Sequence, residues 1–167
     1  MRSRGNSAIV AAQSRICNLP VYESPEDAEM AFYVAIENRD VDAMMDVWSG
    51  SDDVVCIHPG APRLEGREII ADSWQQIFST GESLRFRLTD LRCLREERLS
   101  VHTVREEIEV DGELVDIMLT TNIFACTDDG WHLILHHASA EPDFEDDIDD
   151  TFDSLDDSPP DGSITLH

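Results

Sequence analysis

The spacing of apolar residues changes once along the chain, and this change constrains the fold more than any other feature of the sequence. Before residue 80, apolar residues recur every three or four positions, a period that predicts helices. After residue 80 they alternate with polar residues, which predicts strands. Asp111-Gly112 and Asp129-Gly130 separate the alternating runs and are typical of hairpin turns. Helices followed by a meandering antiparallel sheet indicate an α+β fold with the helices on one face.

Three helices are expected before the sheet. The first follows Ser24-Pro25, where the Ser can cap the helix and the Pro suits its first turn. The second covers residues 41–48, and the third follows Glu65-Gly66. Their apolar faces comprise Ala28, Phe32, Ala35 and Ile36 in the first, Val41, Met44, Met45 and Trp48 in the second, and Ile69, Ile70, Trp74, Ile77 and Phe78 in the third.

We expect one short strand and a set of longer strands. Residues 54–58 form a short apolar run that stops at Pro59-Gly60, between the second and third helices. Alternation begins at residue 84 and continues through 101–110, 114–127 and 131–140. A curled sheet closed by helices makes a cone. We therefore predict a conical, curved antiparallel sheet packed on three N-terminal helices, with a central pocket.

The charge of the chain limits its partners. Its 167 residues carry 36 acids and 12 Arg without any Lys, a net charge of −24. This charge repels phosphate and so argues against nucleic-acid binding, while the lack of Lys excludes Schiff-base chemistry on a lysine. No apolar run approaches the roughly 18 residues that a membrane-spanning helix needs. We expect neither nucleic acid nor membrane as a partner.

The charge distribution divides the chain into three parts. Residues 1–20 carry three Arg and no acid, and their apolar run at 8–12 is too short for a secretory signal, so we expect a flexible N-terminal segment. Residues 21–140 are expected to form the domain. Residues 141–167 carry eleven acids and no Arg, which predicts an acidic disordered tail. The alternative is an acidic helix that folds on a partner, with Phe144, Ile148, Phe152 and Leu155 at helical spacing.

Cysteine use and the lack of cofactor motifs set further expectations. Cys17, Cys56, Cys93 and Cys126 form no C-x-x-C pair and no zinc-type spacing, so free thiols in a reducing, cytoplasmic compartment are expected. The sequence has no Walker A loop, Gly-rich dinucleotide turn or H-E-x-x-H motif. We expect no metal and no cofactor.

Four segments in order, residues 48–60, 65–78, 121–124 and 130–139, carry a family resemblance. Together they resemble the SnoaL-like branch of the nuclear transport factor 2 superfamily, over about 120 residues of the chain. The resemblance implies a cystatin-like roll with a cavity between sheet and helices, and a homodimer through the outer sheet face. It implies no single activity, because the superfamily includes isomerases, cyclases, hydratases, transport adaptors and oligomerisation modules.

The ketosteroid isomerases of this superfamily suggest three site residues. Their catalytic carboxylate precedes a Pro at the end of the first strand, where this chain has His58 before Pro59. Histidine can act as a base near neutral pH. Their oxyanion Tyr corresponds to Phe32, with Tyr33 adjacent, and their second oxyanion donor corresponds to Asn122. The oxyanion hole is only half present, which argues against that specific isomerase activity.

Glu106 is a further candidate base. It lies in strand register with the mostly apolar positions His102, Val104 and Ile108, and burial there would raise the pKa of its carboxyl. A single-residue bulge would instead turn Arg105 and Glu107 inward. The alternative for Glu106 is a cross-strand ion pair with Arg105 or Arg87.

The remaining pocket candidates are aromatic or polar residues near these positions. His136 and His137 point to opposite faces of a strand, so only one can face the pocket, and the sequence leaves the choice open. The tryptophans can be core or pocket wall. The full set predicted to line the pocket is Phe32, Tyr33, Trp48, Trp74, His136, His137 and Ser139.

Two functional hypotheses follow. The first is a SnoaL-like domain of unassigned activity that binds a small apolar or carbonyl-bearing molecule, with isomerase- or lyase-like chemistry carried by His58 as base and Asn122 as donor. The alternative is a non-catalytic dimerisation or protein-interaction module with an acidic tail.

Overall fold

The computed structural model describes residues 20–142, which form three helices and six strands. The predicted N-terminal segment and acidic tail lie outside the described residues, apart from Pro20, Glu141 and Pro142. Within residues 20–142, none of the helices has the length and apolarity needed to cross a membrane.

The predicted helices are confirmed, with one shorter than expected. They are α1 (Pro25–Asn38), α2 (Val41–Val47) and α3 (Arg67–Ser79). The Ser24 side chain caps α1 by accepting a hydrogen bond from the Asp27 amide at 3.1 Å. Helix α2 ends one residue before the prediction, because Trp48 has extended backbone and bridges to Leu133 of the sheet.

The sheet has the strand order β2-β1-β6-β5-β4-β3. Its strands are β1 (Val55–Ile57), β2 (Leu64–Glu65), β3 (Leu84–Arg95), β4 (Leu99–Val110), β5 (Glu113–Thr127) and β6 (Gly130–Ala140). Strands β3 to β6 form the predicted antiparallel meander, but β1 pairs with β6 in parallel. The predicted curved sheet on three helices is confirmed, and the parallel pairing of β1 makes the sheet mixed. No hairpin joins β1 to β6, so nothing in the connection requires them to run in opposite directions.

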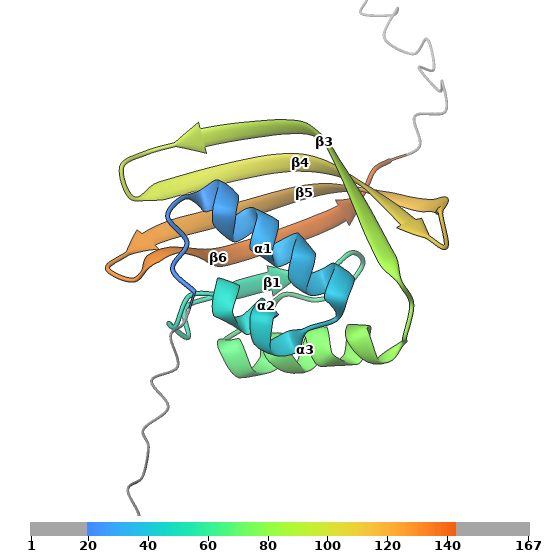
Figure 1. Ribbon diagram of the computed structural model, residues 1–167, viewed down its shortest axis with the longest axis horizontal. Helices are drawn as coiled ribbons and strands as arrows, with labels where there is room; N and C mark the ends of the chain where they lie inside the picture. Colours follow the sequence, from blue (N-terminus) through green and yellow to red (C-terminus); the bar gives the residue numbers. More distant parts are fainter. Residues whose placement is uncertain (1–19, 143–167) are drawn as a thin grey trace, which may run out of the picture.

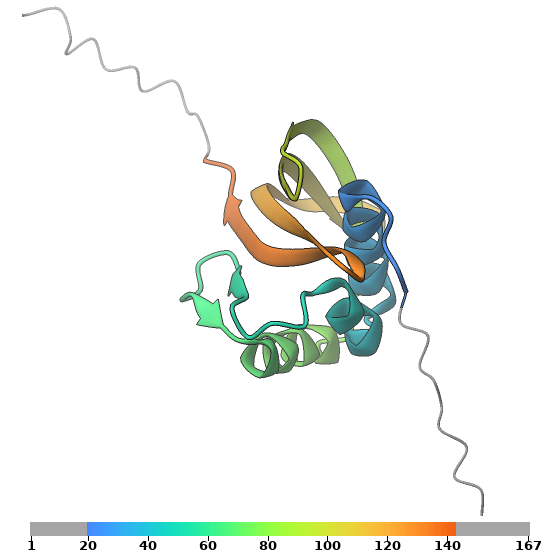
Figure 2. The same ribbon diagram turned by 90° about the vertical axis from the view of Figure 1, so that its left-hand side faces the viewer.

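All three helices lie on one side of the curved sheet. Figure 1 shows α1 crossing this face, with α2 and α3 closing its lower end, and Figure 2 shows the opposite face without helices. The core between the layers consists of fully buried apolar side chains, chiefly Phe32, Met44, Val47, Trp48, Phe124 and Leu133.

Two irregularities in the sheet decide which side chains point inward. Between β5 and β6, Ile123 pairs with Leu135 but Phe124 pairs with Leu133, so Ile134 is an extra residue on β6. The extra residue reverses the in–out alternation of side chains along β6. As a result Leu133 and His136, three positions apart, are both buried. The second lies in β3, where Asp90 adopts a left-handed φ of 49° and the register shifts between Thr89 and Arg92.

Candidate functional site

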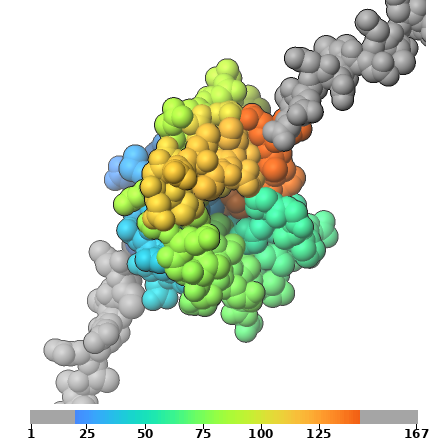
Figure 3. All heavy atoms as spheres, turned by 90° about the vertical axis from the view of Figure 1, so that its right-hand side faces the viewer, coloured from blue at the N-terminus to red at the C-terminus, as the bar shows by residue number. Residues whose placement is uncertain are grey.

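A cavity of about 130 Å³ lies between α1, α3 and the inner face of the sheet. Its wall is mostly apolar and includes three titratable side chains, those of His58, Glu106 and His136. Figure 3 shows a hollow on this side of the molecule, between the β4–β5 hairpin, the start of β3 and the segment after β1. The apolar part of the wall consists of Ile36, Pro59, Trp74, Ile77, Leu84, Phe86, Ile108, Met118 and Ala138.

His58 follows β1 directly and lines the cavity, as the sequence placed it. The edge of its ring packs against Trp74 at a centroid distance of 4.8 Å. Its Nε2 lies 3.1 Å from the Ser73 hydroxyl oxygen on α3. Burial lowers the pKa of His58, so the ring is neutral at neutral pH and has a lone pair available.

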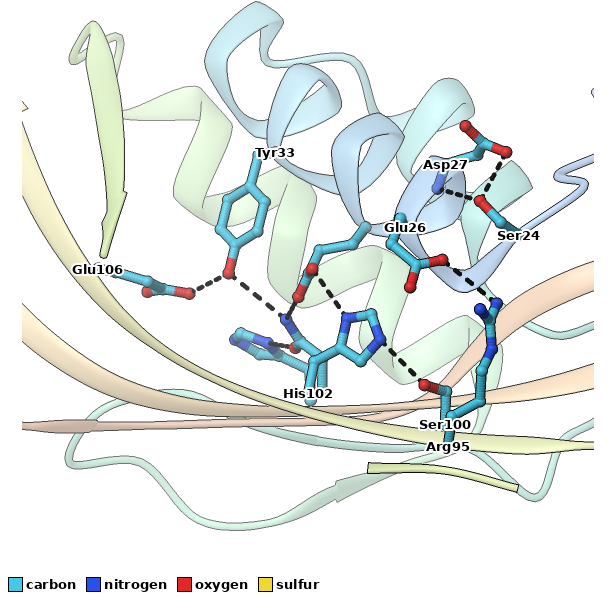
Figure 4. A network of polar contacts seen from close by, with 11 residues as sticks. Ser24, Glu26, Asp27, Tyr33, Arg95, Ser100, His102 and Glu106 are labelled. Atoms are coloured by element: carbon cyan, nitrogen blue, oxygen red, sulfur yellow. Dashed lines mark hydrogen bonds and ion pairs between the residues drawn. The ribbon is translucent and has the colours of Figure 1, made fainter. Parts of the chain in front are cut away.

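Glu106 points inward from β4, as its register predicted. The Tyr33 hydroxyl on α1 donates a buried hydrogen bond of 2.6 Å to Oε1 of Glu106, and Figure 4 shows Tyr33 reaching toward the sheet to meet it. Burial raises the pKa of Glu106, and the hydrogen bond from Tyr33 opposes that rise. A buried carboxyl with a raised pKa in a cavity wall is suited to proton transfer.

The predicted ion pair belongs to the next residue, Glu107. Arg87 and Arg105 both pair with Glu107, and Arg105 also holds Glu141 at 2.9 Å. Because both arginines pair with Glu107, the Glu106 carboxylate forms no ion pair with them and faces the cavity.

Asn122 is fully buried, but it is not part of the cavity wall. Its amide nitrogen faces Glu29 at 3.3 Å and the Tyr33 hydroxyl at 3.4 Å, and its Oδ1 lies 2.8 Å from Nδ1 of His136. The amide therefore orients His136 and cannot serve as the electrophilic donor predicted from the ketosteroid isomerases. Burial, with smaller contributions from His58 and His137, lowers the pKa of His136 to about 3.

Glu29, His102 and Ser100 extend this network and were not predicted as site residues. Glu29 accepts from Nδ1 of His102 at 2.8 Å, and Nε2 of His102 lies 3.0 Å from the Ser100 hydroxyl (Figure 4). All three side chains are buried. The signal for Glu29 was its spacing, since it shares one helix face with Tyr33 at i+4 and Ile36 at i+7.

The other predicted pocket residues take different places. Phe32 packs against Trp74 and His136 at centroid distances of 5.6 and 5.0 Å, behind the cavity wall. His136 faces the cavity, whereas His137 and Ser139 are exposed on the outer face of β6. The parity change at Ile134 accounts for this choice.

Trp48 lies away from the central cavity. It borders a separate surface hollow of about 420 Å³ beside Arg67 and the β5–β6 turn. The Arg67 guanidinium donates to the backbone carbonyls of Met45, Trp48 and Ser49, so this residue holds the end of α2 in place.

Within residues 20–142, one group of side chains could approach a metal ion. Ligand atoms of Glu26, Cys93 and His102 lie within 4.8 Å of one another. Both ring nitrogens of His102 are already hydrogen bonded, and Glu26 pairs with Arg95 at 3.2 Å. The three side chains would have to rearrange before they could bind an ion.

Comparison with known proteins begins with the sequence. The family model of the SnoaL-like domain matches residues 26–142. An F-box protein from Arabidopsis thaliana, SKIP8, is 30% identical over 108 residues, which cover 65% of this chain. The chain spans 46% of the length of that curated relative.

Solved structures share the fold. A candidate calcium/calmodulin-dependent protein kinase type II association domain from Thiobacillus denitrificans is 36% identical with a TM-score of 0.68, over 74% of this chain and 99% of that one. A candidate dehydratase of the nuclear transport factor 2-like family from Streptomyces avermitilis is 34% identical with a TM-score of 0.64, over 69% and 91%. A protein with a cystatin-like fold from Nostoc punctiforme, 11% identical over 73% and 96%, has a TM-score of 0.60 and shows the fold alone. By its sequence match and its fold, this chain belongs to the family of SnoaL-like domains in the nuclear transport factor 2-like superfamily.

Proposed function

We propose that this domain binds a small, mostly apolar molecule with one polar group in its central cavity. The observation that carries the proposal is the composition of the wall, in which nine apolar residues surround His58, Glu106 and His136. Ligand sites are typically apolar with a few polar groups that fix orientation. The free thiols of Cys56, Cys93 and Cys126 suit a reducing compartment, and we place the protein in the cytoplasm.

The size of the cavity limits the ligand. Its volume of about 130 Å³ is close to that of an engineered protein cavity of roughly 150 Å³ that binds benzene. A molecule of five to seven non-hydrogen atoms is therefore the natural occupant, and a steroid would require the cavity to open.

The polar groups can support proton transfer of the isomerase or lyase type. His58 is neutral and can take a proton from carbon. The protonated form of Glu106, which burial favours, can give a proton to a leaving hydroxyl, which departs as water. The similar protein from Streptomyces avermitilis that is named as a candidate dehydratase favours this class of reaction.

A matched pair of substitutions on adjacent residues tests the site. Ala138 lines the cavity, whereas Ser139 lies on the outer face. Ala138→Phe should fill the cavity and abolish binding of benzene-sized probes in a backbone-amide NMR titration, while Ser139→Phe should leave it unchanged. Because Ala138→Phe adds a large side chain to a packed core, Ile77→Trp at the cavity wall is the second filling variant.

The chemistry is tested on a bound probe that has an acidic C–H next to a carbonyl, such as a small ketone. His58→Gln and Glu106→Gln should each slow exchange of the ligand's acidic C–H with D₂O by about 10² or more, whereas His137→Gln should not. Binding that survives both filling variants would place the ligand elsewhere and contradict the proposal.

We also propose that the outer face of the sheet mediates homodimer formation. An apolar row crosses it through directly paired residues, Leu94, Val101, Ile123, Leu135 and Val55. Helices do not cover this face (Figure 2), and the neighbour of 36% identity is named as a candidate association domain. The two functions are compatible, because the cavity opens on the other side of the sheet.

A further inference from the structure

We propose that the cavity selects a ligand that carries a hydroxyl group over a carbonyl compound of the same size and shape. This inference rests on the proposed function and narrows it to one class of ligand. It follows from the hydrogen bonds that the polar side chains of the wall have already made within the protein.

His136 presents a hydrogen-bond acceptor to the cavity. Carboxylate oxygens accept, so the Asn122 amide must turn its NH₂ toward Glu29, at 3.3 Å. The Oδ1 of Asn122 then faces His136, whose Nδ1 must carry the proton across 2.8 Å. The Nε2 of His136 keeps its lone pair. Among the described residues this nitrogen has no hydrogen-bond partner, and protein atoms do not enclose it completely.

His58 presents a second acceptor. The Ser73 hydroxyl donates to the Ile70 carbonyl at 2.7 Å, so its oxygen is left to accept from Nε2 of His58 at 3.1 Å. This places the proton of His58 on Nε2 and the lone pair on Nδ1. The Cys56 thiol lies 4.0 Å from Nδ1 and 3.6 Å from Nε2, and a thiol is only a weak donor.

With Glu106 ionised, the other polar atoms of the wall supply no donor to a bound molecule. Oε1 of Glu106 already accepts from Tyr33, and the second carboxylate oxygen is another acceptor. The indole Nε1 of Trp74 could donate, but it is enclosed by protein atoms. The cavity therefore holds acceptors in fixed positions, and a carbonyl oxygen placed among them would meet lone pairs only.

Cyclopentanol and cyclopentanone test the inference, because they have the same ring and differ only in the polar group. Both are titrated by NMR at pH 8, because a higher pH favours the carboxylate form of Glu106. Cyclopentanol should bind at least about tenfold more tightly, since an unpaired polar group in a buried site costs on the order of 1.4 kcal/mol or more. Equal affinities, or tighter binding of the ketone, would overturn the inference and leave the proposed function standing.

The histidine tautomers give a readout that needs no ligand. Long-range ¹H–¹⁵N correlation spectra of the free protein should show His136 protonated at Nδ1 and His58 at Nε2. The opposite tautomer at both residues would overturn the inference even if cyclopentanol binds. Failure of both probes to bind would overturn the proposed function together with this inference.

Two substitutions outside the cavity wall should weaken the selectivity. Ser73→Ala removes the hydroxyl oxygen that fixes the tautomer of His58. Glu29→Gln lets the Asn122 amide turn over, so that it no longer fixes the tautomer of His136. Each should raise the affinity of the ketone relative to the alcohol by several-fold and shift the tautomer signals of His58 or His136, respectively. In Glu29→Gln the signals of His102 should change too, because Glu29 accepts from its Nδ1. Ser139→Ala, on the outer face, is the control and should change neither quantity. Unchanged selectivity in both variants, with the tautomers shifted, would contradict the proposed cause.

Discussion

At the scale of single residues, the buried histidine of β6 is held in one protonation state by its surroundings. His136 contacts Asn122 through a hydrogen bond and packs against Phe32 and Trp74. Burial, together with His58 and His137, lowers its pKa to about 3, well below the value of an unfolded histidine near 6.5. The folded state therefore binds fewer protons than the unfolded state between these two values.

This difference predicts how stability depends on pH. A depressed folded-state pKa stabilises the fold fully above pH 6.5, and that stability is lost as the pH falls toward 3, at up to about 1.4 kcal/mol per pH unit. His136→Gln should flatten the slope of the unfolding free energy, measured by urea denaturation between pH 6.5 and 4. His137→Gln should keep most of the slope, since its ring is exposed in the folded state. An unchanged slope in His136→Gln would show that other groups cause the acid sensitivity.

At the scale of elements, α1 positions two members of the buried network. It carries Glu29 and Tyr33 one turn apart, and both side chains point toward the sheet. Its first turn is fixed by the Ser24 cap, so the cap also supports the position of Glu29.

Removing the cap should have a measurable cost. Ser24→Ala leaves the Asp27 amide without its side-chain acceptor and should lower the free energy of unfolding by about 1 kcal/mol. Ser24→Asp supplies another capping oxygen and should stay within a few tenths of a kcal/mol of the wild type. Urea denaturation of the three proteins provides the measurement. Equal losses in both variants would assign the effect to the hydroxyl's other contact, with the Asp27 carboxylate.

The elements also show how far the sequence could predict this structure. The spacing of apolar residues predicted the three helices and the meander. The alternation of side chains along β4 correctly predicted that Glu106 points inward. The extra residue Ile134 was not predictable, because a bulge leaves no mark in a run of apolar side chains. The parallel direction of β1 depends on packing between distant segments. Glu29 was overlooked because its helical spacing indicates only an inward position, and its role depends on its distant partners His102 and Asn122.

At the scale of the whole molecule, the uncovered outer face predicts self-association. Leu94 is 72% exposed in the apolar row of that face, and Met30 is 68% exposed on α1, on the other side of the molecule. Leu94→Asp should shift a dimer to monomer in analytical ultracentrifugation, and Met30→Asp should not. Added salt should strengthen the dimer by screening the net charge of −24 on each copy. A wild type that is monomeric at every concentration would contradict the proposed dimer.

The irregular strand β3 has a consequence for how copies of this chain can meet. It is an outer strand of the sheet, and such strands can recruit further strands and start aggregation. The left-handed Asp90 interrupts its hydrogen-bonding edge, and four of the twelve arginines of the chain, Arg85, Arg87, Arg92 and Arg95, lie on it. A second copy adding here would meet a broken hydrogen-bonding ladder and arginines that already pair with acids of their own chain. Addition of a further strand is thus disfavoured at the β3 edge, while two copies can still pack face to face through the outer face of the sheet.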